Sequence, residues 1–387
     1  MRAGARRMMI LAAAAMAVAW LIGGALTASE TTMQAAPQQK PQMVEEVFKN
    51  IQALKGITVD DFIGTMGVMS AALGFCCSDC HSNAGTDKVA WEADTVRKQI
   101  ARRMVTMVAN INRDNFGGRQ TVTCWTCHRG RDRPMVTPAL DYVYGTPNTD
   151  RDDVLTQAPG MPTPDQVLDK YIQAIGGAQR VAGITGYTAR GTSVGFGGLG
   201  GGAQVEIYAK APDQRAVYIH FADPARGDST RTYDGRTGWI ATPLAVLRVY
   251  ELNGGERDGA RLDAQLSFPG QIKQVLRNLR VGLPNTIDDR IVDVLQGDGP
   301  GGVIATLYFD RQSNLLIRTV RFSPSPIGRV PTQVDYSDYR DVGGIRMPFR
   351  FIFSWLDGRD TFELSNIQLN AQIDPAKFGK PNPLGPR

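Results

Sequence analysis

The sequence predicts a multidomain α + β protein, in which a small all-α region precedes an antiparallel β region with a few helices. The chain has 387 residues, which is longer than one hydrophobic core usually serves. Apolar residues recur at helical spacing over residues 43–112, whereas short alternating runs separated by turn residues follow residue 163. The composition, 42% hydrophobic and 21% charged, is that of a folded chain and excludes a largely disordered one.

The formal net charge of +5 includes Arg2, Arg6 and Arg7 near the N-terminus. The small remainder predicts no nucleic-acid partner. An apolar run follows over residues 8–26, and small residues flank a cleavage point near Ala28. Residues 1–28 are therefore predicted to be a secretory signal peptide, with an uncleaved membrane anchor as the alternative. Either interpretation places the folded part in the periplasm, after a spacer at residues 29–42.

Three apolar stripes at helical spacing lie within residues 43–135, the first predicted domain. The first stripe contains Val44, Val47, Phe48, Ile51 and Leu54. The second stripe contains Val59, Phe62, Met66, Met69 and Leu73. The third stripe contains Val96, Ile100, Met104, Met107 and Ile111. Thr58 and Asp61 resemble a capping box at the start of the second helix. The stripes can pair with one another, so we expect this domain to fold without the β region.

The second predicted domain, residues 163–379, follows a linker at residues 136–162 and precedes a tail at residues 380–387. Its first helix is marked by Thr163 as N-cap, Pro164 at the first helical position and Gln166. Strand-like runs then cover residues 205–208, 216–219, 303–309, 315–320 and 349–355.

Two C-x-x-C-H motifs, the attachment sequence for c-type haem, lie in the helical region. They consist of Cys77, Cys80 and His81 and of Cys124, Cys127 and His128. Two thiols at this spacing reach the two vinyl groups of one porphyrin, and the adjacent histidine is the proximal ligand of the iron. We therefore predict two covalently attached haems. A structural zinc site or, at Cys124–Cys127, a thioredoxin-like pair is the alternative. Cys76 is expected to be a buried free thiol.

The sixth ligand of each iron is predicted to be a methionine, because no third histidine lies in this region. Met66 or Met69 is the candidate for the first haem, and Met104 or Met107 for the second. The periodicity leaves each choice open, and packing in the apolar stripe is the alternative role of all four.

Residues 66–81, 101–112 and 122–130 together resemble the cytochrome c subunit of photosynthetic reaction centres. The resemblance implies that a helix runs along each haem, offers a methionine, turns, and delivers the attachment motif. Matched residue by residue, it assigns Met66 to the first iron and Met104 to the second. The family's subunit typically carries four haems in two pairs, and this chain has one pair.

The resemblance implies a periplasmic dihaem cytochrome that transfers single electrons between redox partners and is not an enzyme. Its partner would be a reaction centre, a respiratory complex or a soluble cytochrome. A dihaem peroxidase-like enzyme and a lipid or lipoprotein carrier with redox-sensing haems are the alternatives. Arg129, directly after His128, is predicted to contact a haem propionate. Arg97, Lys98, Arg102 and Arg103 are candidates for the same role or for docking an acidic partner, or form a solvated helix face.

The β region resembles the periplasmic half-barrels related to lipoprotein carriers, over about residues 164–378. The matching features are Tyr233–Gly235 before Gly238–Trp239, Tyr308–Asp310 before Leu315, Asp338–Arg340, and Met347–Phe349. This resemblance implies a curved antiparallel sheet around an apolar cavity, and hence an apolar ligand for the β domain.

Overall fold

The computed structural model describes residues 40–86, 88–134, 136–137, 156–195, 202–222, 227–243 and 247–382. Outside these ranges lie the predicted signal peptide or anchor, almost all of the spacer, much of the linker and most of the tail. Residues 41–387 form one compact unit. Among the helices of the described ranges, none is both long and apolar enough to cross a membrane.

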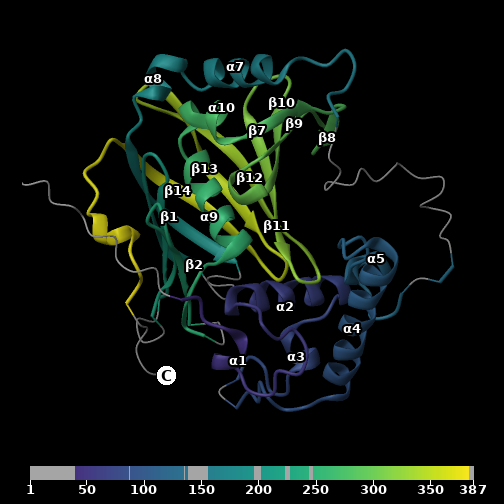
Figure 1. The fold of residues 1–387 in the computed structure, drawn as a ribbon. Helices are drawn as coiled ribbons and strands as arrows, with labels where there is room; N and C mark the ends of the chain where they lie inside the picture. The colour runs from purple at the N-terminus through teal and green to yellow at the C-terminus, as the bar shows by residue number, and fades with distance from the viewer. Residues whose placement is uncertain are drawn as a thin grey trace, which may run out of the picture. The chain divides into compact units, whose positions relative to one another are not determined.

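A 14-stranded antiparallel sheet dominates this unit, in the order β6-β5-β4-β3-β2-β1-β14-β13-β12-β11-β10-β9-β7, with β8 paired to β9 (Figure 1). The first seven strands are β1 (Gly186–Gly195), β2 (Gly202–Lys210), β3 (Gln214–His220), β4 (Ser229–Tyr233), β5 (Gly238–Ala241), β6 (Val249–Glu251) and β7 (Arg277–Val281). The others are β8 (Asn285–Ile287), β9 (Arg290–Asp298), β10 (Ile304–Asp310), β11 (Leu316–Ser325), β12 (Gly328–Val342), β13 (Ile345–Ser354) and β14 (Arg359–Leu369). The predicted strand runs overlap β2, β3, β10, β11 and β13, so the antiparallel sheet is confirmed.

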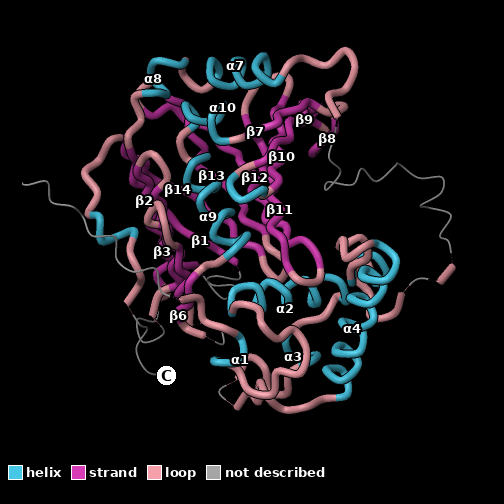
Figure 2. Tube along the Cα trace, in the orientation of Figure 1, coloured by secondary structure: helices cyan, strands magenta, loops and turns pink. Residues whose placement is uncertain are grey.

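The helices fall into two groups. In Figure 2, α1 to α4 of the first group lie at one end of the strands, whereas α7 and α8 of the second group lie at the other end and α9 and α10 lie over the strands. The first group contains α1 (Val44–Val47), α2 (Val59–Leu73), α3 (Cys77–Cys80), α4 (Val96–Phe116) and α5 (Cys124–His128). The second contains α7 (Pro164–Ala174), α8 (Ala178–Ala182), α9 (Gly254–Leu266) and α10 (Ile272–Val275). Short 3₁₀ turns lie at Pro269–Gln271, Pro300–Gly302 and Pro375–Phe378.

The predicted helix starts are confirmed by hydrogen bonds. Thr58 Oγ1 accepts from the Asp61 N–H at 3.1 Å, and Thr163 Oγ1 accepts from the Gln166 N–H at 3.3 Å. Each bond satisfies one of the free N–H groups in the first helical turn. In contrast, the prediction that the first stripe lies on one long helix was wrong. Only Val44–Val47 is helical, because Asn50, Leu54 and Gly56 adopt positive φ, which interrupts an α-helix.

The core of the sheet lies under the second group of helices. Leu168 from α7, Ile175 directly after α7, and Leu262 from α9 are buried against Leu295 and Leu307 of the sheet. Apolar burial of this kind supplies the main stabilisation of a sheet covered on one face. The helices of the second group therefore cover part of the sheet.

Helix α2 also packs against the sheet. Val68 forms one buried apolar cluster with Ile327 and Val330, which lie at and just after the connection between β11 and β12. Helix α2 therefore shares a buried cluster with the sheet. The expectation that residues 43–135 fold without the β region stays a prediction.

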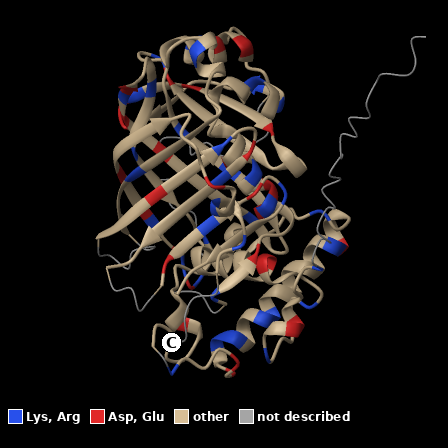
Figure 3. Cartoon of the chain, turned by 90° about the vertical axis from the view of Figure 1, so that its left-hand side faces the viewer, with Lys and Arg blue, Asp and Glu red and all other residues tan. Residues whose placement is uncertain are grey.

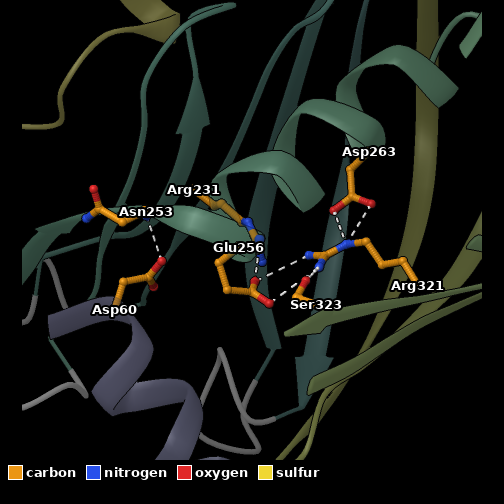
Figure 4. A network of polar contacts seen from close by, with 7 residues as sticks. All are labelled: Asp60, Arg231, Asn253, Glu256, Asp263, Arg321 and Ser323. Carbon is orange, nitrogen blue, oxygen red and sulfur yellow. Dashed lines mark hydrogen bonds and ion pairs between the residues drawn. The ribbon is translucent and has the colours of Figure 1, made fainter. Parts of the chain in front are cut away.

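A buried polar network joins α2 to α9 and the sheet (Figure 4). Asp60, 4% exposed, accepts the Asn253 N–H at 2.7 Å. Nearby, Arg321 donates to Asp263 at 3.1 Å and to Glu256 at 3.4 Å. Burial opposes ionisation of Glu256, but the charges of Arg321 and Arg231 outweigh burial and hold the pKa of Glu256 below its usual range.

The pKa of Asp60 lies well above its usual range, first because of burial and then because of the Glu256 charge. The unfolded chain releases this proton at a lower pH than the folded chain. Asp60 therefore lowers the free energy of unfolding as pH rises from about 4 through its folded pKa.

Asp60→Asn keeps an acceptor for the Asn253 N–H and removes the titration. The variant should match the natural protein near pH 4 and be more stable at neutral pH, by about 1.4 kcal/mol for each unit by which the pKa is raised. Guanidinium unfolding followed by circular dichroism between pH 4 and pH 8 measures this difference. Asp61→Asn, at a half-buried neighbour, is the control. A constant difference between Asp60→Asn and the natural protein would contradict the prediction.

Candidate functional site

Each attachment motif lies on a short helix that follows a long one. Helix α3 follows α2 after Gly74, whose left-handed conformation (φ +67°) ends α2. Helix α5 follows α4 after Gly117 (φ +60°) and a loop that ends at Thr123. Glycine adopts this conformation without the steric cost that a Cβ would add.

The first motif is held by residues at the start of α4. Arg97 Nη1 donates to the carbonyl oxygen and to Oδ1 of Asp79, both at 2.9 Å. Thr95, which caps α4, donates its hydroxyl to the Cys80 carbonyl oxygen at 3.0 Å. These bonds fix the backbone between the two cysteines of the motif against a rigid helix.

The imidazole of His81 is half-buried, with its ring centroid 4.9 Å from that of Trp91 in an edge contact. Burial, followed by the charge of Lys98, lowers the pKa of His81. A neutral imidazole has a free lone pair for a metal ion. Its Nδ1 is buried without a hydrogen-bond partner.

The second motif is positioned by Asn112, a buried residue of α4. Its Oδ1 accepts from the N–H groups of Thr121 and Val122 at 3.0 and 2.9 Å, and its Nδ2 donates to the Val122 carbonyl oxygen at 2.7 Å. The amide thereby satisfies three backbone groups of the loop that leads into α5. The sequence prediction did not include Asn112 as a site residue. A polar residue directly after the apolar Ile111, at the end of a stripe, was a usable signal.

His128 has a defined ring orientation. Its Nδ1 lies 3.0 Å from the Arg131 carbonyl oxygen, and because a carbonyl can only accept, Nδ1 carries the proton. Nε2 is then the nitrogen with the free lone pair. Histidines that bind metals usually have this kind of support from the opposite ring nitrogen.

The turn after the second motif packs on the end of α2. The Gly130 N–H donates to the Ala72 carbonyl oxygen at 2.8 Å, and a Cβ added at Gly74 would lie 2.5 Å from the Gly130 oxygen. Helices α2 and α5 are therefore in direct contact, as are α3 and α4. The structure brings each attachment motif against the long helix that precedes the other motif.

The four motif cysteines are free thiols. Burial, followed by the charge of Asp357, raises the pKa of Cys77, and burial raises the pKa of Cys80 and Cys124. A thioredoxin-like pair relies on a lowered thiol pKa, so the raised pKa of Cys124 does not fit that alternative.

Cys76 is exposed, so the prediction of a buried thiol was wrong. Its N–H donates to Asp79 Oδ2 at 2.9 Å, and its Sγ lies 3.2 Å from the same oxygen. These bonds at the start of α3 hold the side chain at the surface.

The candidate methionines differ in their packing. Met69 joins the apolar cluster around Val68, whereas the described apolar clusters do not include Met66. On α4, Met107 is 43% exposed and Met104 is half-buried.

The third predicted stripe is uncovered by protein along part of α4. Val96 is 71% exposed, Ile100 and Met107 are each 43% exposed, and Trp125 of the second motif is 54% exposed. Exposed apolar side chains are common singly, but a row of them on one helix indicates a surface that another group covers. Exposed apolar side chains, together with the two cysteines and one histidine of each motif, are the residue types that hold a porphyrin.

Charged residues of both signs are interspersed over the chain (Figure 3). Arg97 pairs with Asp79, Arg102 pairs with Asp94, and Lys98 donates to the carbonyl oxygens of Trp91 and Ala93. These three cations therefore have partners within the chain. Arg129 is exposed and ends α5 in the left-handed conformation (φ 50°), and its predicted propionate contact stays a prediction.

Comparison with known proteins confirms the resemblance of the N-terminal third to reaction-centre cytochromes. Residues 19–153 match the family model of the photosynthetic reaction centre cytochrome C subunit. The photosynthetic reaction center cytochrome c subunit of Roseobacter denitrificans is 27% identical over 149 residues, which are 35% of this chain and 39% of that protein. The corresponding subunit of Thermochromatium tepidum is 32% identical over 115 residues, 28% of this chain and 27% of that protein. The match thus spans well under half of each relative.

Solved structures with similarity to this chain include a LolA superfamily protein from Nitrosomonas europaea. It has a TM-score of 0.39 and 14% identity, and the match covers 57% of this chain and 99% of that one. A DUF1329 family protein from Desulfovibrio piger has a TM-score of 0.37 and 13% identity, over 56% of this chain and 96% of that one.

Asn112→Ala should destabilise the second motif, because it removes the partners of three backbone groups in a partly buried loop. We expect a loss of about 1–3 kcal/mol in the free energy of unfolding. Asn115→Ala on the same helix is the control, since exposed Asn115 makes one local bond to the Ile111 carbonyl oxygen. Guanidinium titrations of both variants measure the effect, and equal losses would contradict the role of Asn112.

Proposed function

We propose that this protein is a periplasmic c-type cytochrome that holds two covalently attached haems and transfers electrons one at a time between redox partners. The observation that carries the proposal is the repeated arrangement of a methionine-bearing helix, a glycine turn and a C-x-x-C-H helix. This arrangement lies in the stretch that matches reaction-centre cytochromes.

Cys77 and Cys80 would attach the first haem, with His81 and Met66 as its iron ligands. Cys124 and Cys127 would attach the second haem, with His128 and Met104 as ligands. A bound haem supplies reversible one-electron chemistry between Fe(II) and Fe(III).

The residues of the chain orient these groups. The Arg131 carbonyl directs Nε2 of His128 away from the backbone, and Trp91 fixes the ring of His81 by an edge contact. With a haem bound, the apolar side chains of α4 would exclude water from one side of the site, and the methionine thioethers would favour the reduced state relative to a second histidine. Arg129 would pair with a propionate.

The partner that we propose is a redox protein, either a reaction centre, a respiratory complex or a soluble cytochrome. Residues 1–28 would export the chain and could anchor it to the inner membrane. An apolar ligand of the sheet region has less support. One cavity of about 470 Å³ on the sheet is lined by ten residues that include Asp338, Arg340, Arg350 and Glu363, a charged rather than an apolar set.

An electron carrier is favoured over a dihaem peroxidase-like enzyme because such an enzyme needs one five-coordinate iron. Met66 and Met104 occupy the ligand positions that the family resemblance assigns, one for each iron. No separate observation favours the third candidate, a lipid carrier with sensory haems.

Protein produced in a host with a c-haem maturation system should contain two haems per chain, because both motifs are intact. Alkaline pyridine haemochrome absorbance against protein concentration measures the ratio. Cys124→Ala with Cys127→Ala should reduce the ratio to about one. A ratio of one in the natural protein that this double variant leaves unchanged would exclude the second site.

Met66→His and Met104→His should each lower the midpoint potential of one haem, because imidazole stabilises Fe(III) relative to a thioether. We expect at least a tenfold change in the one-electron equilibrium, about 59 mV. Potentiometric titration measures the shift, and the near-infrared sulfur-to-iron band reports the bond itself. Met69→Ala and Met107→Ala are the matched controls. Loss of the band in these controls would move the ligand assignment by one helical turn.

A further inference from the structure

We propose that the sheet is part of the haem-binding unit, because the tips of two hairpins position α2 and thereby Met66. In this proposal, which rests on the proposed function, the packing at Gly67 helps to set the potential of the first haem. Gly67, Trp355 and Leu356 are positioning residues, since they act through the helix that carries the ligand.

The connection between β11 and β12 contacts α2 and the loop before the second motif. Ile327 and Val330 bury Val68. A Cβ added at Gly328 would lie 3.3 Å from Val68 Cγ1 and 3.7 Å from Thr123 Cβ. The Ser325 carbonyl oxygen accepts from Gln120 Nε2 at 2.9 Å. This hairpin thus touches the chain next to both proposed haem sites.

The turn between β13 and β14 lies directly against the middle of α2. A bond from the Trp355 N–H to the Gly358 carbonyl oxygen, 2.9 Å long, closes the turn. A Cβ added at Gly67 would lie 2.8 Å from Trp355 Cη2 and 3.1 Å from Leu356 Cδ1. An added Cβ would require α2, the Trp355 ring or the Leu356 side chain to move.

The ends of α2 are fixed as well. Asp60 in its first turn accepts the Asn253 N–H, and Ala72 in its last turn accepts the Gly130 N–H. A helix held at both ends cannot relieve a collision at its centre by sliding as a whole. A displacement at Gly67 is therefore passed to the adjacent residue, Met66.

The helix offers a matched pair of glycines for the test. A Cβ added at Gly64, one turn before Gly67, would meet Val330 Cγ2 at 3.4 Å, an ordinary contact. Both Gly67→Ala and Gly64→Ala raise helix propensity by the same amount, about 1 kcal/mol. The two variants therefore differ in the collision with Trp355 and Leu356 and not in backbone preference.

The full-length protein with both haems is titrated potentiometrically, and the first haem is identified as the one whose potential Met66→His changes. Gly67→Ala should lower that potential by about 59 mV or more, which is at least a tenfold change in the one-electron equilibrium. It should also weaken the near-infrared sulfur-to-iron band. Gly64→Ala should change neither. Adding Trp355→Phe to Gly67→Ala removes the far ring atoms and should restore both signals.

A Gly67→Ala potential equal to that of Gly64→Ala, with two haems still attached, would overturn the proposal. If Gly67→Ala does not fold, Trp355→Phe alone tests the same contact from the sheet side. An unchanged potential in that variant would also overturn the proposal. Absence of haem from the natural protein would instead refute the proposed function, so the two failures are distinguishable.

Discussion

The structure depends on the packing of one helix, α2, against three different partners. Its apolar side contacts the hairpin tips of the sheet through Val68, its first turn contacts α9 through Asp60, and its last turn contacts the second motif through Ala72. Because the same helix carries Met66, the proposed ligand of the first iron is fixed by residues far from the attachment motif. The proposed haem-binding region is therefore packed directly on the sheet through α2.

The charged network under α9 supports this arrangement. Arg321, which is 3% exposed, neutralises Glu256 and Asp263, and so permits α9 to lie on β11 with charged residues between them. Buried charges without partners would cost several kcal/mol each. With these partners, α9 holds Asn253 in the position where its N–H meets Asp60. The network thus stabilises the packing of α9 on the sheet. Through the contact between Asn253 and Asp60, it also stabilises the start of α2.

Local features were predictable from the sequence because their cause is local. The caps at Thr58 and Thr163 and the attachment motifs depend on residues within a few positions of each other. The contact of Gly67 with Trp355 depends on a chain path that periodicity does not describe. For the same reason the α2 stripe was assigned to partners within its own region, and the cover supplied by Ile327 and Val330 was missed. The bonding partners of Asn112 were also missed, since they are backbone groups rather than a motif.

The two proposed haem sites are mechanically connected. Thr95 and Arg97 of α4 hold the backbone of the first motif, whereas the end of α2 holds the turn after the second motif. Each attachment motif is thus supported by the helix that offers the other iron its proposed methionine. A shift of α2 against the sheet would move Met66 in the first site and Gly130 beside the second. In the proposed haem protein, the position of Met66 would therefore depend on its contacts with the sheet, although the sheet holds none of the proposed haem ligands.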